Sequence, residues 1–160
     1  MLVTNHVLSG AVIGALARSP LLAFPLGFAS HLVLDAAPHW GQLESRKKFL
    51  QVAVADGLTG LAVMAAATAA AEPRRRAAVV AGMVGAALPD LNKPALLFFG
   101  RSPFPEPFED LHRRIQHEAP DRFLSHEVAG GAAFAAVLAA LAVGARWRAA
   151  REAAAGGQPS

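Results

Sequence analysis

Long apolar runs separated by short polar or charged segments dominate the sequence, and they predict its elements. The runs consist mostly of Ala, Leu and Val, with few β-branched clusters outside them, which is typical of helices. Five runs have the length of a helix, and the third also has the length of a membrane span. They cover residues 5–17, 20–37, 51–71, 77–88 and 123–145. The pattern therefore predicts an all-α fold, a membrane helical bundle of about five helices.

Two polar segments interrupt this pattern. Residues 89–94 break the fourth run, and the short apolar segment 95–99 continues it. Residues 101–122 hold four prolines and predict one short amphipathic helix, over residues 108–117. We expect this helix to lie on the membrane surface just before the last helix of the bundle.

The chain is long enough for one domain with its own core. We expect residues 1–148 to form a single helical membrane domain. Residues 149–160 are Ala, Gly, Gln, Pro and Ser with scattered charge, and we expect a disordered tail there. A secretory signal is the alternative for residues 5–17, but no Lys or Arg precedes them and another apolar run follows at once, so we expect no cleavage.

The composition favours a membrane protein. Of the residues, 54% are hydrophobic and 17% are charged, against about a quarter charged in typical soluble domains. The basic residues cluster at the ends of apolar runs, where they can anchor to lipid headgroups. No aromatic residues interleave with these clusters, so we expect membrane lipids and no nucleic acid as partners. The mean hydropathy of +0.35 is modest, which leaves a soluble Ala-rich bundle as the alternative.

The stretch SHLVLDAAPHW carries the first chemical signal, because it places His31, Asp35 and His39 in an apolar run. His31 and Asp35 are four residues apart and share one helix face. They can ligate a divalent metal together, or the carboxylate can orient a ligating histidine. Pro38 ends the helix, so His39 lies on the following turn and can reach back to the same site. A hydrogen-bonding pair near a helix end is the alternative.

The positions of the other polar residues favour a site. If the five helices alternate in direction, as short loops require, all six histidines fall at one end of the bundle. Structural polar residues have no reason to gather in this way, whereas a metal or acid–base site explains it. The chain has no cysteine, so His and carboxylate must hold any metal. The residues at this end include His6, His31, Asp35, His39, Asp56, Asp90, His112, His117 and His126.

Four of these residues can be interpreted individually. Asp56 is either a first-turn acid favoured by the helix dipole or an intramembrane carboxylate that marks a site. Asp90 lies in the charged break of the fourth run, which is costly in lipid unless it lines a cavity or reaches the interface. His112 and His117 are five apart and share no helix face, so we expect each to be a solvated surface histidine.

Two glycine patterns bear on the packing. Gly10 and Gly14 form a GxxxG, which predicts close helix packing in a membrane. Gly27 precedes Asp35 by eight residues, and Gly82 precedes Asp90 by eight. This repeat predicts two related helical hairpins, each with a second helix that ends in an acid.

Three motifs carry a resemblance to a known family. They are NHxxxG from Asn5 to Gly10, GxxSHxxxDxxPH from Gly27 to His39, and GxxLPDLNK from Gly85 to Lys93. Together they resemble the YdjM-like inner-membrane metal-dependent hydrolases, and the HxxxDxxPH core is similar to the His/Asp helix of zinc-dependent phospholipases C and their nuclease relatives. The resemblance implies a multi-pass protein of the bacterial inner (cytoplasmic) membrane, with His and Asp of this spacing as zinc ligands.

The sequence also departs from that family. The family commonly has an LPDxDH-like turn and a later HS pair. Here Asn92 and Lys93 follow Leu91, and the late motif is Ser125-His126-Glu127. One metal ligand of the family pattern is therefore missing or replaced.

These patterns predict a membrane-embedded hydrolase that holds one or two divalent metals, Zn or Mn, and acts on phosphoester bonds, with lipids as candidate substrates. The expected metal ligands are His31 and Asp35, with His6, His39, Asp90 and His126 completing the set. Glu127 or Asp56 is the expected general base.

Two other functions fit the same residues. One is a non-catalytic structural or partner-binding membrane protein with a metal clip. The other is an ion transporter, in which buried acids form a relay. Acids at helix ends favour the hydrolase or the clip, and acids in the middle of a span favour transport.

Overall fold

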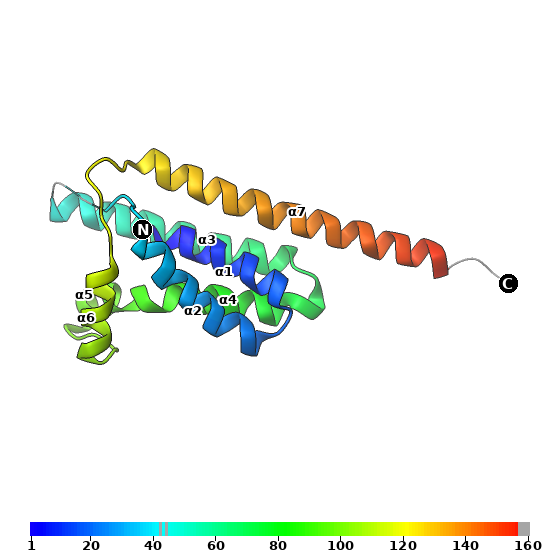
Figure 1. Cartoon of the computed structure of the whole chain (residues 1–160), viewed down its shortest axis with the longest axis horizontal. Helices are drawn as coiled ribbons and strands as arrows, with labels where there is room; N and C mark the ends of the chain where they lie inside the picture. Colours follow the sequence, from blue (N-terminus) through cyan, green and yellow to red (C-terminus); the bar gives the residue numbers. More distant parts are fainter. Residues whose placement is uncertain (42, 44, 157–160) are drawn as a thin grey trace.

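The computed structural model describes residues 1–41, 43 and 45–156, which contain α-helices, two 3-10 helices and no β-strand. It confirms the predicted all-α bundle, with a short helix before the last one (Figure 1). The elements in chain order are α1 (Val3–Ala17), α2 (Pro20–Ala36), α3 (Arg46–Ala70), η1 (Pro73–Arg75), α4 (Arg76–Ala87), η2 (Leu88–Leu91), α5 (Asn92–Phe99), α6 (Glu106–Ile115) and α7 (Leu124–Gly156).

Helices α1, α2 and α4 pack closely through glycines. A Cβ atom built on Gly10 would collide with the carbonyl oxygen of Gly82, and one built on Gly27 would collide with the same oxygen. Gly14 lies in the same way against the backbone of Ala78. Small residues let helix backbones approach this closely. The close packing expected from the GxxxG of α1 is therefore confirmed, and its partner is α4.

Helices α3 and α7 flank this core. Helix α3 packs against α1 and α4, and α7 runs along α1 and extends beyond it (Figure 1). Both are long and apolar enough to cross a membrane. In their most apolar windows only 6% of the α3 residues and 11% of the α7 residues are buried. A core helix of a soluble protein would be mostly buried, so these two helices present apolar surface outward.

Several boundaries differ from the expectation, among them those of α6, which spans Glu106–Ile115 rather than residues 108–117. Helix α3 begins at Arg46, behind Ser45, whose side chain accepts a hydrogen bond from the Lys48 amide at 3.3 Å. Asp56 is consequently beyond the first turn of α3, and its interpretation as a first-turn acid is wrong. Helix α7 continues to Gly156, so a disordered tail from residue 149 is also wrong. The Ala, Arg and Glu there are strong helix formers. Residues 157–160 of the predicted tail lie outside the described residues.

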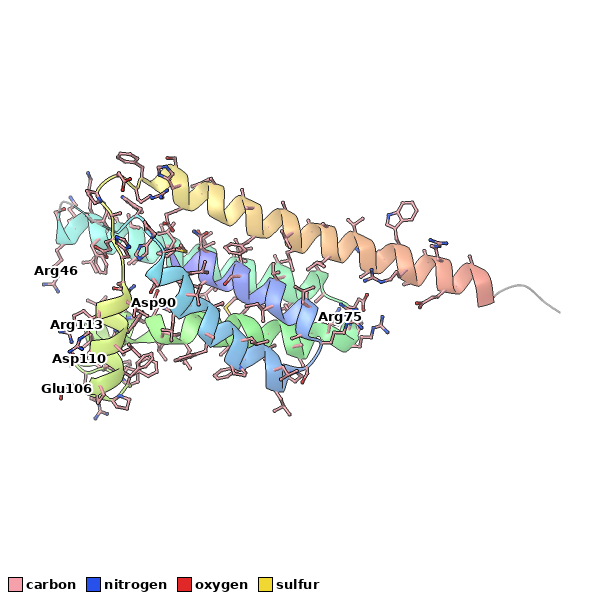
Figure 2. All side chains as sticks on the ribbon, in the orientation of Figure 1. Arg46, Arg75, Asp90, Glu106, Asp110 and Arg113 are labelled. Atoms are coloured by element: carbon pink, nitrogen blue, oxygen red, sulfur yellow. The ribbon has the colours of Figure 1, made fainter. Side chains whose placement is uncertain are left out.

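Helix α6 lies across one end of the bundle. Phe108 of α6 contacts Phe28 of α2, with ring centroids 5.6 Å apart. The segment after α6 pairs with the segment after α2: His117 N donates to Asp35 O at 2.9 Å, and His39 N donates to His117 O at 3.0 Å. Asp90 lies at this end of the bundle, and Arg75 lies at the opposite end (Figure 2). The packing of α6 thus closes the end where the polar residues gather.

Candidate metal centre

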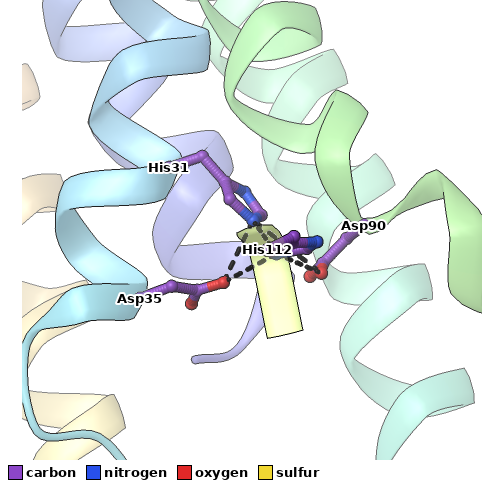
Figure 3. Close-up of side chains that lie close together, drawn as sticks. All are labelled: His31, Asp35, Asp90 and His112. Carbon is purple, nitrogen blue, oxygen red and sulfur yellow. Dashed lines mark hydrogen bonds and ion pairs between the residues drawn. The ribbon is translucent and has the colours of Figure 1, made fainter. Parts of the chain in front are cut away.

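Four buried side chains from three parts of the chain meet at this end. They are His31 and Asp35 of α2, Asp90 of η2 and His112 of α6 (Figure 3). One nitrogen or oxygen atom of each lies within 4.8 Å of the corresponding atom of every other. Two imidazoles and two carboxylates at this separation form a donor set that could hold a metal ion.

Three of the donor atoms form a nearly regular triangle. His31 Nε2 lies 3.0 Å from His112 Nε2, and each of these nitrogens lies 3.1 Å from Asp35 Oδ2. Tetrahedral coordination with bonds of about 2.0 Å requires ligand atoms about 3.3 Å apart, so these three fit a zinc ion with little movement. Asp90 Oδ1 lies 3.9 Å from His31 Nε2 and 4.0 Å from His112 Nε2 and would have to approach.

The tautomer of His31 suits metal binding. Its Nδ1 lies 2.7 Å from the carbonyl oxygen of Ala86, which can only accept, so Nδ1 carries the proton. In the neutral ring Nε2 then has a free lone pair, and it is Nε2 that points into the group. A backbone carbonyl that fixes the tautomer in this way is a common partner of metal-bound histidines.

Asp90 already has a cationic neighbour, Lys93, whose Nζ lies 2.8 Å from Asp90 Oδ1. Burial alone would raise the pKa of the Asp90 carboxyl, but Lys93, His6 and His31 together outweigh burial and hold this pKa below its usual range. Burial alone would lower the pKa of Lys93, and the charge of Asp90 raises it instead. Asp90 is therefore ionised and able to ligate, with Lys93 as a competing cation.

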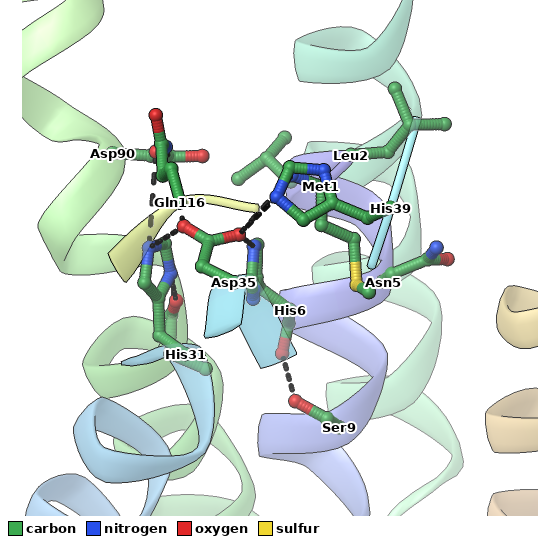
Figure 4. Close-up of polar contacts among 12 residues, drawn as sticks. Met1, Leu2, Asn5, His6, Ser9, His31, Asp35, His39, Asp90 and Gln116 are labelled. Atoms are coloured by element: carbon green, nitrogen blue, oxygen red, sulfur yellow. Dashed lines mark hydrogen bonds and ion pairs between the residues drawn. The ribbon is translucent and has the colours of Figure 1, made fainter. Parts of the chain in front are cut away.

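The second oxygen of Asp35 faces a different pair of histidines. Asp35 Oδ1 lies 3.2 Å from His6 Nε2 and 3.7 Å from His39 Nε2 (Figure 4). The ammonium group of Met1 lies among them, 3.1 Å from Asp35 Oδ1 and 3.3 Å from His39 Nε2. His39 Nδ1 lies 3.1 Å from Trp40 O, so its Nε2 has the free lone pair. This side of Asp35 therefore accommodates a positive charge.

His6 is fully buried; its Nε2 faces Asp35 Oδ1 at 3.2 Å, but its Nδ1 has no hydrogen-bond partner among the described residues. Its ring stacks on that of His31, with centroids 3.8 Å apart. A buried polar group left unsatisfied costs free energy, and such groups in native structures often mark an absent ion or water. The unpartnered nitrogen of His6 is thus a second observation that favours a bound ion or water in this cluster.

Asp56, a predicted general base, caps α1. Asp56 Oδ2 accepts from the Val3 amide at 2.6 Å, and Asp56 Oδ1 accepts from the Thr4 amide at 3.1 Å and the Thr4 hydroxyl at 2.6 Å. Leu2, at the N-cap position of α1, supplies no side-chain hydrogen bond, so Asp56 replaces the missing cap. Its contacts hold the turn that carries His6.

Glu127, the other predicted general base, is buried and joins three segments. Its Oε2 accepts from the Leu2 amide at 3.0 Å and from Asn5 Nδ2 at 2.9 Å, and its Oε1 lies 3.2 Å from the donating Trp40 amide. Both carboxylate oxygens are thereby used to tie α7 to the start of α1 and to the turn after α2. These contacts give Glu127 a positioning role, and its role as a base stays a prediction.

The structure reverses the expected positions of His126 and His112. His126 was the expected ligand, but its side chain is exposed, and its Nδ1 accepts from the Phe123 amide at 3.0 Å. His112 was the expected surface residue, but it is 2% exposed and belongs to the four-residue group. The signal was available in the sequence, because His112 follows Phe108 by four residues on the same face of an amphipathic helix.

No family model, curated protein or solved structure matches this chain. The resemblance to the YdjM-like hydrolases consequently rests on its motifs alone, and the function has to be argued from the site.

Proposed function

We propose that this protein is a membrane-embedded hydrolase that uses a divalent metal ion to cleave phosphoester bonds. The observation that carries the proposal is the triangle of His31 Nε2, His112 Nε2 and Asp35 Oδ2, with edges of 3.0 to 3.1 Å in the buried interior. Asp90 adds a second carboxylate, and the mixed nitrogen and oxygen set suits Zn or Mn. When bound, such an ion supplies Lewis-acid chemistry: it lowers the pKa of a water molecule and neutralises phosphate charge.

The chain's own residues have separate tasks in this proposal. Asp35 orients both groups of histidines, because its two oxygens face different pairs. His6 and His39 with Asp35 Oδ1 hold a second cation, at the place where the Met1 ammonium lies. Lys93 supplies a positive charge beside Asp90 that can meet a phosphate oxygen.

Two further observations favour a membrane enzyme over a soluble one. Helices α3 and α7 are long and apolar enough to span a membrane and are largely exposed. The three motifs that resemble the YdjM-like family also supply the site: His6, His31, Asp35, His39 and Asp90 all lie in them. His112 supplies the donor that the altered LPDLNK turn lacks. We therefore propose membership of that family and a multi-pass location in an inner membrane.

The test is the metal content of protein purified in detergent, for the wild type, His112→Ala and His126→Ala. We expect near-stoichiometric zinc or manganese in the wild type and a loss of at least tenfold in affinity for His112→Ala. His126→Ala is the matched control, because it removes an exposed histidine at the same end of the bundle. A wild type that binds no divalent metal after reconstitution, or a His112→Ala variant that binds it unchanged, refutes the proposal.

Activity separates the hydrolase from its main rival, a metal clip. Metal-loaded protein is incubated with bis(p-nitrophenyl) phosphate and with p-nitrophenyl phosphate. The hydrolase releases nitrophenol from one of them, and release falls in His112→Ala. Stoichiometric metal without any phosphoester cleavage points to a structural clip instead.

A further inference from the structure

A large cavity lies against the candidate metal centre. Its volume is about 880 Å³, and it runs between α3 on one side and η2 and α5 on the other. Most of its wall is apolar, and typical members are Val54, Leu61, Met64, Leu97 and Phe98. Several of these side chains are also exposed to the exterior of the bundle. The cavity is therefore an open apolar groove rather than a sealed void.

Part of the groove wall is polar and lies beside the metal donors. Asp90 and Lys93 line it, and so do Trp40 and Gln116. Asp90 belongs to the four-residue group, and Gln116 Nε2 donates to Asp35 Oδ2 at 3.3 Å. Arg46, at the start of α3, adds a second basic residue to the lining, about 15 Å along the helix from Asp56, and Asp56 and Glu118 add carboxylates. A ligand in the groove would thus have an apolar body and a polar group beside the metal centre, where Lys93 can meet an anionic oxygen.

The groove is also long. Its α3 residues extend from Arg46 to Met64, which corresponds to roughly 27 Å at the rise of an α-helix. That length is comparable to the hydrocarbon core of a bilayer, about 30 Å. Helix α3 is a candidate span, so the groove opens on the face where lipid chains would lie. A long hydrocarbon chain matches this shape better than a compact solute does.

We infer that the groove holds the acyl chains of a phospholipid, with its phosphate against Lys93 beside the metal centre, so that the substrate is a membrane phospholipid. This inference rests on the proposed function and specifies its substrate. Three features favour a phospholipid over a second copy of the chain: continuity with the metal donors, the Lys93 ammonium beside those donors, and a length comparable to a candidate span. Hydrolysis is balanced by one water: its oxygen joins phosphorus, the P–O bond to the leaving alcohol breaks, and the alcohol takes the proton.

Gly57 offers a way to fill the groove without disturbing the fold. It lines the groove, and a Cβ atom added there meets nothing within 4 Å. The variant Gly57→Leu therefore occupies the space meant for the chain. Ala55→Leu is the matched control, because Ala55 is exposed on the same helix and does not line the groove. Neither residue contributes a metal donor, so both variants keep the metal content of the wild type.

Binding is measured without catalysis, through the fluorescence of Trp40. The chain has two tryptophans, so Trp147→Phe leaves Trp40, in the groove, as the only one. Metal-free Trp147→Phe protein in detergent is titrated with phosphatidic acid that carries brominated acyl chains, a contact quencher. We expect saturable quenching, unchanged by Ala55→Leu and about tenfold weaker in affinity for Gly57→Leu, the loss expected when roughly two methylene groups no longer fit. We expect a brominated neutral glyceride of equal chain length to bind more weakly, because it lacks the phosphate group.

Hydrolysis of alkyl p-nitrophenyl phosphates of increasing chain length completes the test. We expect KM to fall as the alkyl chain lengthens in wild type and Ala55→Leu, and to stay flat in Gly57→Leu. Cleavage with no dependence on chain length, together with equal quenching in both variants, overturns the lipid inference and leaves the hydrolase intact. Saturable binding without cleavage of any ester overturns the proposed function and leaves a lipid-binding groove. Quenching that never saturates means that the chains are only solvating the protein, and the inference is then wrong.

Discussion

Asp35 is the residue on which the site depends, because its two oxygens serve different partners. Oδ2 contacts the His31 and His112 nitrogens, and Oδ1 contacts those of His6 and His39. A carboxylate with two faces can join two cation positions, whereas a histidine offers only one lone pair. Loss of Asp35 therefore removes more than loss of any single histidine.

Lys93 allows a prediction, because it competes with a metal for Asp90. We expect Lys93→Met to bind zinc or manganese more tightly, by about tenfold or less, since a partly solvated cation is removed from the site. The same change should raise KM for anionic phosphoesters, because the phosphate loses a charged partner. Chelator-competition titration measures the first effect and steady-state kinetics the second. If metal binding weakens instead, Lys93 supports the site structurally.

The exchange between His112 and His126 shows where residue-level prediction stops. Spacing identified His31, Asp35 and His39, because they lie in one helix and the turn after it. His112 belongs to a separate helix, and its participation depends on how α6 docks through Phe108 onto Phe28. The spacing between His112 and His117 did not show whether they share a helix face, because α6 ends at Ile115, before His117. Sequence places donors along an element, and tertiary packing decides which element reaches the site.

The packing of α1, α2 and α4 is the element-scale feature that positions the donors. Gly27 and Gly82 lie against each other, and each precedes an acid by eight residues, so Asp35 and Asp90 reach the same end. The repeat in the sequence predicted that the second helix of each hairpin ends in an acid, but not that the two glycines are in contact. It did not predict that η2 continues directly into α5. This continuation places the Lys93 ammonium beside the Asp90 carboxylate.

The glycine contact gives a prediction about stability. In Gly82→Ala the new Cβ would collide with the carbonyl oxygen of Gly10, so α1 and α4 must separate. We expect the free energy of unfolding to fall by about 1–3 kcal/mol, and metal affinity to fall with it. The control is Gly144→Ala on α7, where the nearest atom is the flexible end of Arg148 at 3.6 Å. Thermal unfolding in detergent should show a lower Tm for the first variant only; equal Tm values would contradict the close packing.

Asp56 can be assigned to capping or to catalysis by one variant. As a cap of α1, its loss in Asp56→Ala should cost about 1–2 kcal/mol of stability. The turnover of metal-loaded protein should then change by only a few-fold. A general base contributes about 100-fold or more, so a loss of that size with unchanged stability would establish the catalytic role instead. The two measurements are the unfolding midpoint and kcat per bound metal.

At the scale of the whole molecule, the polar site lies at one end of the bundle and two apolar helices lie along its sides. The donors gather where α6 closes one end of the bundle, while α3 and α7 present apolar sides outward (Figures 1 and 2). The alternation of helices predicted from the sequence was enough to place all the donors at one end. It could not predict the groove along α3, because a groove depends on the distance between α3 and α5 rather than on the composition of either.

The outward faces lead to a prediction about membrane insertion. Val137 lies midway along α7 and is exposed, so in a soluble protein an arginine there would be tolerated. If α7 spans a bilayer, Val137→Arg places a charge in the hydrocarbon core at a cost of about 2.5–3.5 kcal/mol. We expect a smaller share of this variant in carbonate-washed membranes, and an unchanged share for Ala149→Arg, which adds a charge beside Arg148 and Arg151 at the helix end. Equal membrane fractions for both variants would show that α7 does not cross the bilayer, and the groove along α3 would then face water rather than lipid.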